Sequence, residues 1–298
     1  MTDFFGASTP ARMPRLERTS ACTCFMEAYE SVDATGLRAA QLLERRDVVG
    51  ALKSGGATKL SVGAVVADME FQSQGRFGRH WHSVPGGSLV AALTVLVPRV
   101  VVEDSTVQGW LTPLGSLSLL RGLNAVLRAN NVDAESLELT LKWPNDLYCR
   151  GMKLGSVHLD IANVPDEPDY VALIYSLGLN LSVRAEFLPM VGATSLGLHA
   201  PAGLPEFEEL RDGVIAETIF DLGSRLMKLV QRPDNTVSEL FAQMNVVCHM
   251  NGWEYTFHLQ NGGEVTGCVS SLNQDASLTL LTAEGCMCLR TYDVGFAA

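Results

Sequence analysis

The chain has 298 residues, of which 47% are hydrophobic and 18% charged, and its formal net charge is −11. This composition is typical of a globular protein with a sizeable core and excludes a disordered chain. The negative charge argues against a nucleic-acid-binding module, which usually carries a basic stripe. No run of about 18 apolar residues is present, so no transmembrane span is expected. The N-terminus lacks the apolar core of a secretory signal, which makes the cytoplasm the expected compartment.

The seven cysteines predict free thiols, because their number is odd and no secretory signal precedes them. Two pairs, Cys22 with Cys24 and Cys286 with Cys288, offer zinc binding as an alternative. Paired zinc ligands usually have two to four residues between them, whereas these pairs have one. We therefore expect no metal ion held by protein side chains.

The first quarter of the chain predicts an arm, a helix and a buried strand. Residues 1–24 form an N-terminal arm, and its first 20 residues, rich in Ser, Thr, Pro and Arg, predict loose attachment. Residues 37–46 have leucines and alanines at helical spacing, with Asp33 or Thr35 as the expected cap. Residues 61–68 are small and β-branched, as in a buried strand.

The next elements are a long loop, a strand and a helix. Residues 70–87 connect two strands, and loops of this length in compact domains are usually functional or disordered. Residues 88–97 predict a second buried strand. Residues 110–131 predict a helix with Thr112 as N-cap and Pro113 at its first position.

Residues 135–141, ESLELTL, alternate polar and apolar side chains as a half-buried strand does. Pro144 ends the pairing because it has no N–H group to donate. Lys142, Asn145 and Asp146 are therefore expected at the end of a strand, where polar groups of mixed α/β sheets often meet a ligand. The alternative is a solvated lysine followed by an Asx turn.

The second half of the chain predicts a β-hairpin, two helices and a small β module. Residues 151–162 and 169–183 pair across an acidic loop, and residues 207–230 and 237–247 are helical. From about residue 250, four or five short strands alternate with turns at NGG, NQDAS and AEG. Such a module of about 45 residues is too small to be stable without packing on its neighbour.

Residues 75–81, GRFGRHW, combine glycines, arginines and a tryptophan. Glycines let a loop approach a ligand closely and expose N–H groups to anions. Arg76 and Arg79 add forked donors for phosphate or carboxylate oxygens, and Trp81 offers a flat apolar surface. Together with Lys142, these loop residues suit a site that stabilises the negative charge of phosphate groups during a reaction. Neither a P-loop nor a G-x-S-x-G nucleophile elbow is present.

The order of these motifs resembles biotin–protein ligases. That family has a Ser-Thr-Asn element, a Gly-Arg loop ending in Trp, then K-W-P-N-D, K-L-A-G-I-L, G-x-N and a small SH3-like domain. Over roughly 25–298 this chain has VDATG, SQGRFGRHW, KWPNDLY, MKLGSVHLD, LGLNLS and a C-terminal β module. The resemblance implies an α+β fold. A catalytic domain over 25–247 would have a mixed or antiparallel sheet flanked by helices, as in class II synthetases, and 248–298 would form the SH3-like barrel.

The resemblance also implies an ATP-dependent ligase that uses Mg²⁺ and converts biotin to biotinyl-5′-AMP. The biotinyl group would then pass to a specific lysine of a biotin carboxyl carrier domain, the expected partner. The implied catalytic cations are Lys142, Arg76 and Arg79. The implied biotin- and adenylate-binding residues are Ala34, Thr35, Gly36, Glu70, Gln72, Gln74, Gly75, Arg76, Trp81, Lys142, Asn145, Lys153 and Asn180.

Several of these residues also have structural interpretations. Lys153 is expected to pair with Asp146 or to stay solvated rather than to touch a ligand. Asn180 is interpreted either as a ligand-binding residue or as one that closes a turn, and Trp81 either as a ligand contact or as a core anchor. The three histidines nearest the motifs are expected to be structural: His80, His82 and His158.

The chain departs from the family pattern at the biotin end of the site. Ser-Thr-Asn becomes Ala34, Thr35 and Gly36, so two side chains that contact biotin are lost. Each missing hydrogen bond leaves a polar ligand atom unpaired, at a cost of about 1–3 kcal/mol, which predicts weak biotin binding. The remaining departures are Ser73, Gln74, Ser156 and the family's glutamine, which falls at Glu70 or, with a shorter loop, at Gln72.

Three other functions compete with a biotin ligase. A lipoate or octanoyl transferase shares the fold but lacks the KWPND turn in this form. A degenerate, non-catalytic protein that binds the acceptor would explain the lost side chains. A ligase–repressor is disfavoured, because only 31 residues precede VDATG and the chain is acidic, so no DNA binding is expected. An edge strand of the sheet would allow a homodimer.

Overall fold

The structure is a computed structural model that describes residues 10–56, 59–73, 81–200, 202–260 and 262–296. Its helical elements are α1 (Glu17–Cys22), α2 (Thr35–Leu42), α3 (Arg46–Lys53), α4 (Arg99–Glu103), α5 (Ser105–Gln108), α6 (Leu111–Ala129), η2 (Glu135–Leu137), η3 (Ala185–Phe187), α7 (Leu196–His199), α8 (Phe207–Gln231) and α9 (Pro233–Val247). Its strands are β1 (Phe25–Val32), β2 (Val62–Glu70), β3 (Ser88–Pro98), β4 (Leu139–Lys142), β5 (Asp146–Cys149), β6 (Met152–Asn163), β7 (Tyr170–Asn180), β8 (Glu254–Leu259), β9 (Glu264–Leu272), β10 (Leu278–Thr282), β11 (Gly285–Leu289) and β12 (Val294–Phe296).

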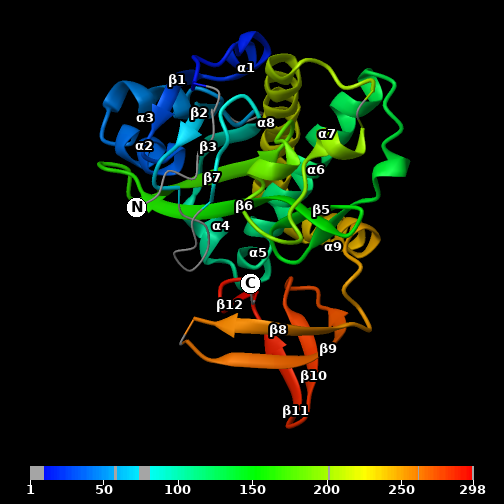
Figure 1. Ribbon diagram of the computed structural model, residues 1–298. Helices are drawn as coiled ribbons and strands as arrows, with labels where there is room; N and C mark the ends of the chain where they lie inside the picture. Colours follow the sequence, from blue (N-terminus) through cyan, green and yellow to red (C-terminus); the bar gives the residue numbers. More distant parts are fainter. Residues whose placement is uncertain (1–9, 57–58, 74–80, 201, 261, 297–298) are drawn as a thin grey trace.

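The strands form two sheets (Figure 1). The larger sheet has the order β1-β2-β3-β7-β6-β5-β4, in which β1 and β2 are parallel and the other neighbours antiparallel. The smaller, C-terminal sheet is antiparallel with the order β11-β10-β9-β8-β12. The predicted α+β class, the mixed sheet and the β6–β7 hairpin are therefore confirmed, and the second sheet is consistent with an SH3-like module.

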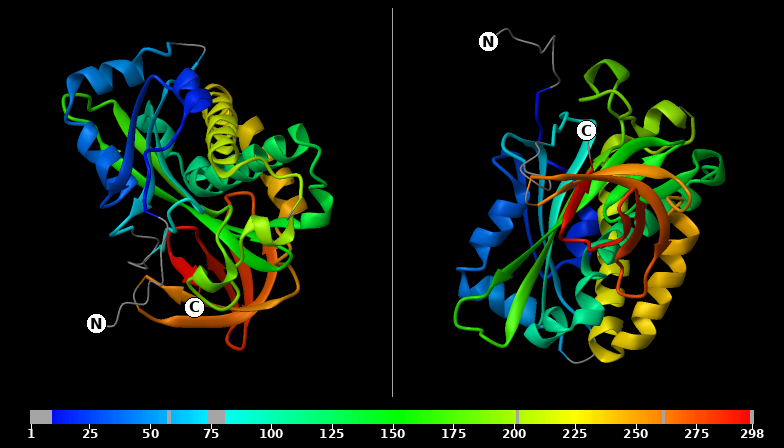
Figure 2. Two further views of the ribbon diagram at one scale, coloured as in Figure 1. Left: turned by 45° about the horizontal axis from the view of Figure 1, so that its top comes forward. Right: turned by 90° about the horizontal axis from the view of Figure 1, so that it is seen from below.

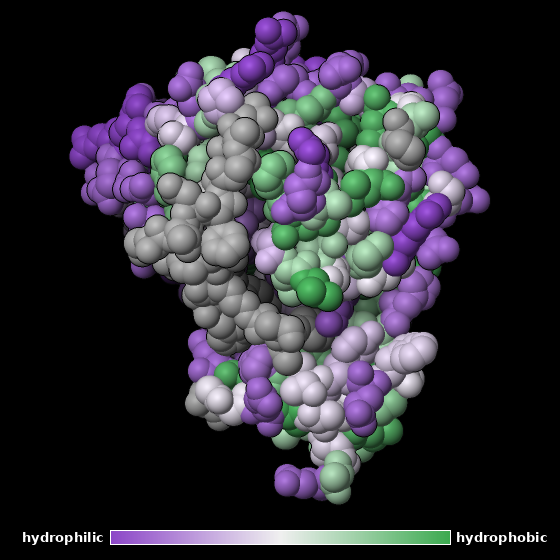
Figure 3. Space-filling model, viewed as in Figure 1, coloured by the Kyte–Doolittle hydropathy of each residue, from purple (hydrophilic) through white to green (hydrophobic). Residues whose placement is uncertain are grey.

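Helices cover the two faces of the larger sheet unequally (Figures 1 and 2). Helices α6 and α8 pack on one face and bury the main core, which includes Leu93 and Leu177. Helices α2 and α3 pack on the other face, over Ala92 and Ile174. The outer surface of α2 and α3 carries mainly hydrophilic side chains (Figure 3). Because these two helices are short, they cover only part of their face.

Two glycines inside α6 bring that helix close to its neighbours. A Cβ at Gly115 would lie 2.5 Å from the Tyr175 ring, and one at Gly122 would lie 2.5 Å from Thr218 Oγ1. Glycine inside a helix usually lowers stability by roughly 0.5–1 kcal/mol relative to alanine. At these two positions, however, a side chain would not fit. Helix α6 begins at Leu111 rather than after Thr112, with Trp110 as its N-cap.

The prediction of a strand over 135–141 is wrong for the first half of that range. Residues Glu135–Leu137 form the turn η2, and β4 begins only at Leu139. Between them Glu138 adopts a left-handed backbone with φ 46°. The alternating pattern continues through this turn, so it did not reveal where extended structure begins.

The described part of the N-terminal arm packs on α8, so the expectation of loose attachment is wrong from Leu16 onward. Leu16 and Thr19 are buried, and the Asp212 carboxylate accepts the backbone N–H groups of Arg18 and Thr19 at 2.8 Å each. Within the described residues, no helix combines the length and apolar character needed to cross a membrane.

The C-terminal sheet is joined to the larger one through two buried tryptophans. Trp143 donates its indole N–H to the Ala276 carbonyl at 2.7 Å and meets Phe257 edge-on at 6.4 Å between ring centroids. Trp110 donates in the same way to the Gln274 carbonyl at 2.7 Å. The tryptophan of the KWPND motif therefore anchors the C-terminal module instead of facing solvent.

Candidate active site

The KWPND turn lies on the face of the larger sheet that α2 and α3 leave partly open. Residues that pair directly across neighbouring strands point to the same side of a sheet and lie about 4.7–4.9 Å apart per strand. One such row crosses all seven strands. Its members are Tyr29, Ala67, Val90, Gly178, Ser156, Asp146 and Lys142. The next row contains Ala92, Ser176 and His158, and Ala92 contacts the α2–α3 core. Ser156, Gly178 and Lys142 therefore continue the open face beyond these helices.

The N-terminus of α2 reaches the same face. Ala34 is the N-cap, and neither Asp33 nor Thr35 caps the helix with its side chain. Instead the Glu70 carboxylate accepts both the backbone N–H and the hydroxyl of Thr35 at 2.6 Å each. A carboxylate at a helix N-terminus is stabilised by the helix dipole. Of the two candidates for the family's glutamine, Glu70 is the one beside Thr35, whereas Gln72 is exposed.

Gly36 and Ser176 fit together where the family pattern expects an asparagine side chain. A Cβ at Gly36 would clash with Ser176 Oγ. The Ser176 hydroxyl therefore occupies the space next to Gly36, so a side chain at position 36 is sterically coupled to Ser176. Ser176 was not among the sequence-predicted residues, and its signal was a small polar residue on an otherwise apolar strand.

We expect Gly36→Ala to destabilise the protein by about 1–3 kcal/mol, because overpacking forces a shift at this contact. The double variant Gly36→Ala with Ser176→Gly should recover most of that loss. Urea unfolding of the wild type, both single variants and the double variant measures the coupling free energy. Additive effects of the two substitutions would contradict the contact.

Trp81 lies flat on the sheet at the end of the glycine–arginine loop. A Cβ at Gly178 would come within 2.7 Å of the Trp81 ring, so only glycine allows this stacking. The Trp81 indole nitrogen is buried without a hydrogen-bond partner. The backbone N–H of Trp81 donates to the Ser73 carbonyl at 3.3 Å, and the Ser83 hydroxyl accepts the Glu70 N–H at 2.8 Å. These bonds hold the two ends of the loop together.

A buried ion pair fixes the chain just after this loop. Asp68 Oδ1 accepts the backbone N–H of Gly86 at 3.1 Å and a guanidinium N–H of Arg211 at 2.8 Å. Its other oxygen accepts the backbone N–H of Arg12 at 3.0 Å. The loop predicted to cover the ligand is thus tied to α8 and to the N-terminal arm. Five loop residues with a predicted role lie outside the described residues: Gln74, Gly75, Arg76, Arg79 and His80.

Lys142 ends β4, as predicted, and its ammonium group lies against two tyrosine rings. Its Nζ is 4.9 Å from the ring centroid of Tyr255 and 5.9 Å from that of Tyr148. Burial, followed by the charge of Asp146 and by Tyr255, raises the pKa of Tyr148 to about 12. Burial also raises the pKa of Tyr255. Both rings therefore remain neutral phenols near neutral pH, and the lysine meets no phenolate charge from them.

The other predicted residues of the motif make structural contacts. Lys153 forms an ion pair with Asp146 at 2.7 Å, as its structural interpretation expected. Asn145 donates its side-chain N–H to the Val157 carbonyl at 2.9 Å, which ties the turn to β6. Asn180 donates to the Thr194 carbonyl at 3.1 Å and closes the following loop. Their ligand-binding roles stay predictions.

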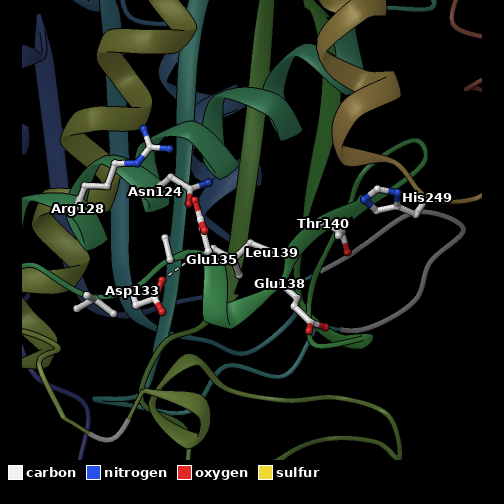
Figure 4. Close-up of a pocket in the computed structure, with 10 residues that line it drawn as sticks. Asn124, Arg128, Asp133, Glu135, Glu138, Leu139, Thr140 and His249 are labelled. Atoms are coloured by element: carbon white, nitrogen blue, oxygen red, sulfur yellow. Dashed lines mark hydrogen bonds between the residues drawn. The ribbon is translucent and has the colours of Figure 1, made fainter.

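A cavity of about 700 Å³ opens beside β4 but holds none of the predicted site residues (Figure 4). Arg128 and Asn124 reach it from α6, and His249 reaches it from the linker to the C-terminal sheet. The remaining charged lining residues are acidic: Asp133, Glu135 and Glu138. We place the candidate site on the open sheet face instead, because the row containing Lys142 and Gly178 lies there.

The described residues include no group of three His, Cys, Asp or Glu side chains arranged to hold a metal ion. All seven cysteines are free thiols, as predicted. Cys286 and Cys288 are exposed on β11, and Cys149 is buried on β5, where it pairs with Leu139 of β4.

Comparison with known proteins agrees with this geometry. The biotin/lipoate A/B protein ligase family matches residues 55–162. The biotin–[acetyl-CoA-carboxylase] ligase of Mycobacterium tuberculosis is 27% identical over 72% of both chains. The bifunctional ligase/repressor BirA of Bacillus spizizenii is 29% identical over 42% of this chain, which spans only 34% of that protein.

The fold matches that of the biotin protein ligase from Aquifex aeolicus in complex with biotin and ATP. The TM-score is 0.64 at 21% sequence identity, and the match covers 92% of this chain and 97% of that one. The sequence motifs, the sheet order and these similarities agree. Residues 55–162 therefore match the biotin/lipoate A/B protein ligase family, and the chain is similar in sequence and in fold to biotin–protein ligases.

Proposed function

We propose that the protein activates biotin with MgATP and transfers the biotinyl group to a lysine of a biotin carboxyl carrier domain. In the first step a carboxylate oxygen of biotin attacks the α-phosphorus of ATP. The bond from that phosphorus to the oxygen bridging the β-phosphate breaks, and pyrophosphate leaves. In the second step the acceptor amine, whose pKa starts near 10.4, loses a proton and attacks the acyl carbon of biotinyl-5′-AMP, and AMP leaves.

One observation carries this proposal. Lys142, the Trp81–Gly178 stack and the N-terminus of α2 at Thr35 share one open sheet face. An apolar wall, backbone that permits close approach and a fixed cation are what a small apolar carboxylate and a phosphate require together. The biotin–[acetyl-CoA-carboxylase] ligase from Mycobacterium tuberculosis, which matches 72% of this chain, supports biotin as the substrate.

In the first step two anions approach each other, and charge develops on the α-phosphoryl oxygens. A preorganised cation at that point lowers the barrier, which is the role we assign to Lys142. Arg76 and Arg79 are assigned, on the sequence resemblance alone, to the phosphates. In the second step water competes for the mixed anhydride, so the glycine–arginine loop and Trp81 are assigned to excluding it.

A second function is favoured by the contact between Gly36 and Ser176. The hydroxyl fills space where the family pattern expects a biotin-binding side chain, and Glu70 replaces a neutral glutamine with a carboxylate. These changes are also compatible with a protein that recognises the acceptor domain without modifying it.

The two functions separate in one experiment. The protein is incubated with MgATP, a biotin carboxyl carrier domain and biotin, with lipoate and octanoate in parallel reactions. Mass spectrometry then locates any acyl group on the acceptor. Biotin on one lysine supports the ligase. Acceptor binding without any acyl group supports the binding protein, and lipoyl or octanoyl transfer would indicate the sister activity of the family.

We expect biotin alone to bind weakly, because two hydrogen-bonding side chains are replaced by Ala34 and Gly36. Loss of two bonds worth about 1–3 kcal/mol each moves the dissociation constant by one to several powers of ten. Isothermal titration calorimetry without nucleotide measures this constant. A nanomolar value would show that other groups replace the lost bonds.

A further inference from the structure

The C-terminal module contributes a side chain to the candidate site. Tyr255, on β8, presents its ring face to the Lys142 ammonium at 4.9 Å from the ring centroid. Tyr148, on β5 of the larger sheet, lies on the lysine at 5.9 Å. Both distances are within the roughly 6 Å over which an aromatic face attracts a cation. The lysine therefore sits where the two sheets meet.

The junction between the sheets holds Tyr255 in register with the lysine. The residue that follows Lys142 in the chain is Trp143, which is fully buried and hydrogen-bonded to the Ala276 carbonyl at 2.7 Å. Trp143 packs on Phe257, and Phe257 packs on Tyr255 with ring centroids 6.3 Å apart. Movement of the module relative to the KWPND turn would therefore move the ring relative to the ammonium group.

The neighbouring carboxylate is committed elsewhere. Asp146 pairs with Lys142 across the β4–β5 ladder, but its side chain forms an ion pair with Lys153 at 2.7 Å. An aromatic face attracts an ammonium group without neutralising its charge, whereas a carboxylate partner would. A lysine side chain has many conformations, so an aromatic ring that is held in place can orient its ammonium group toward an incoming anion.

We propose that Tyr255 is a positioning residue, through which the C-terminal module orients the Lys142 ammonium toward the reacting carboxylate and α-phosphate. This inference rests on the proposed function. It makes the module part of the adenylation site, and it assigns that effect to the ring of Tyr255 and not to its hydroxyl group.

The kinetic test compares Tyr255→Leu, Tyr255→Phe and the control Tyr292→Leu, an exposed tyrosine of the same module. Single-turnover formation of biotinyl-5′-AMP should slow about tenfold in Tyr255→Leu, mainly in the rate constant and little in the biotin KM. Tyr255→Phe keeps the ring and should stay within about twofold of the wild type, as should Tyr292→Leu. If Tyr255→Phe is as slow as Tyr255→Leu, the ring does not act as proposed.

The Lys142→Met background separates positioning from general destabilisation. Because Tyr255 acts through the lysine, Tyr255→Leu should cause no further slowing of the residual reaction when Lys142→Met is already present. Equal losses in both backgrounds would overturn the proposal and assign Tyr255 to stability alone.

A measurement without substrates distinguishes failure of this inference from failure of the proposed function. Competitive acetylation followed by mass spectrometry reports how reactive the Lys142 amine is in the intact protein. Tyr255→Leu should raise that reactivity at least about threefold by releasing the ammonium group, whereas Tyr255→Phe should not. Unchanged reactivity in Tyr255→Leu overturns the inference. If the wild-type protein makes no adenylate but Tyr255→Leu still raises the reactivity of Lys142 threefold, the proposed function is overturned and the contact is established.

Discussion

Lys142→Met is expected to slow formation of biotinyl-5′-AMP by about 10²–10³-fold, with a much smaller effect on folding. Removal of one preorganised group that stabilises developing charge typically costs this much. The methionine side chain fills similar space between the rings of Tyr148 and Tyr255, so packing should survive. Release of pyrophosphate from MgATP and biotin, followed in a single turnover, measures the rate.

The matched control for this prediction is Lys228→Met. Lys228 lies in the last turn of α8, where its side chain is 42% exposed and its ammonium group is 3.9 Å from the Glu239 carboxylate. Its replacement changes the net charge of the protein by the same amount as Lys142→Met. A comparable rate loss in both variants would mean that net charge, and not the position of Lys142, governs the reaction.

Trp143→Ala is expected to lower the free energy of unfolding by about 3–5 kcal/mol, the range measured for large aromatic residues removed from cores. The side chain is 0% exposed, and its loss would open a cavity between the two sheets. It would also leave the Ala276 carbonyl without its 2.7 Å indole donor. Urea unfolding followed by circular dichroism gives the free energy.

Trp253→Ala is the control for that measurement. Trp253 lies at the start of the same module but is 67% exposed, so its removal should change stability by less than about 0.5 kcal/mol. If the two tryptophan variants unfold at the same urea concentration, Trp143 does not anchor the module.

The buried strands were predicted accurately because their composition leaves few alternatives. Residues 61–68 and 88–97 are mostly small or β-branched, and all but the first residue of these two ranges lie in β2 and β3, which are buried almost throughout. The hairpin of β6 and β7 followed from two such runs separated by an acidic loop. Hydrophobic patterning reports burial directly, which is why these elements were found.

Elements whose ends depend on local backbone conformation were predicted less well. Glu138 adopts a left-handed conformation that separates η2 from β4, and no glycine or proline marks this break in the sequence. Helix α6 begins before the Thr112–Pro113 signal because Trp110 is fixed by the C-terminal module. A local backbone conformation thus sets the start of β4, and a tertiary contact sets the start of α6.

The parts of the candidate site that could be predicted are those whose residues lie close together in the sequence. Lys142 at a strand end and the Lys153–Asp146 pair follow from residues close together in sequence. The ring of Tyr255 on Lys142 depends on how two sheets dock, and the Gly36–Ser176 contact depends on the register between a helix and a strand. No spacing within a single segment encodes either contact.

Isotope exchange between labelled pyrophosphate and ATP tests the central claim most directly, because it requires only the first chemical step and no acceptor. If the open face next to Lys142 forms an acyl-adenylate from biotin, label will enter ATP only when biotin and Mg²⁺ are both present, and Lys142→Met will abolish nearly all of it. Absence of biotin-dependent label at high concentrations of the wild-type protein would contradict the account.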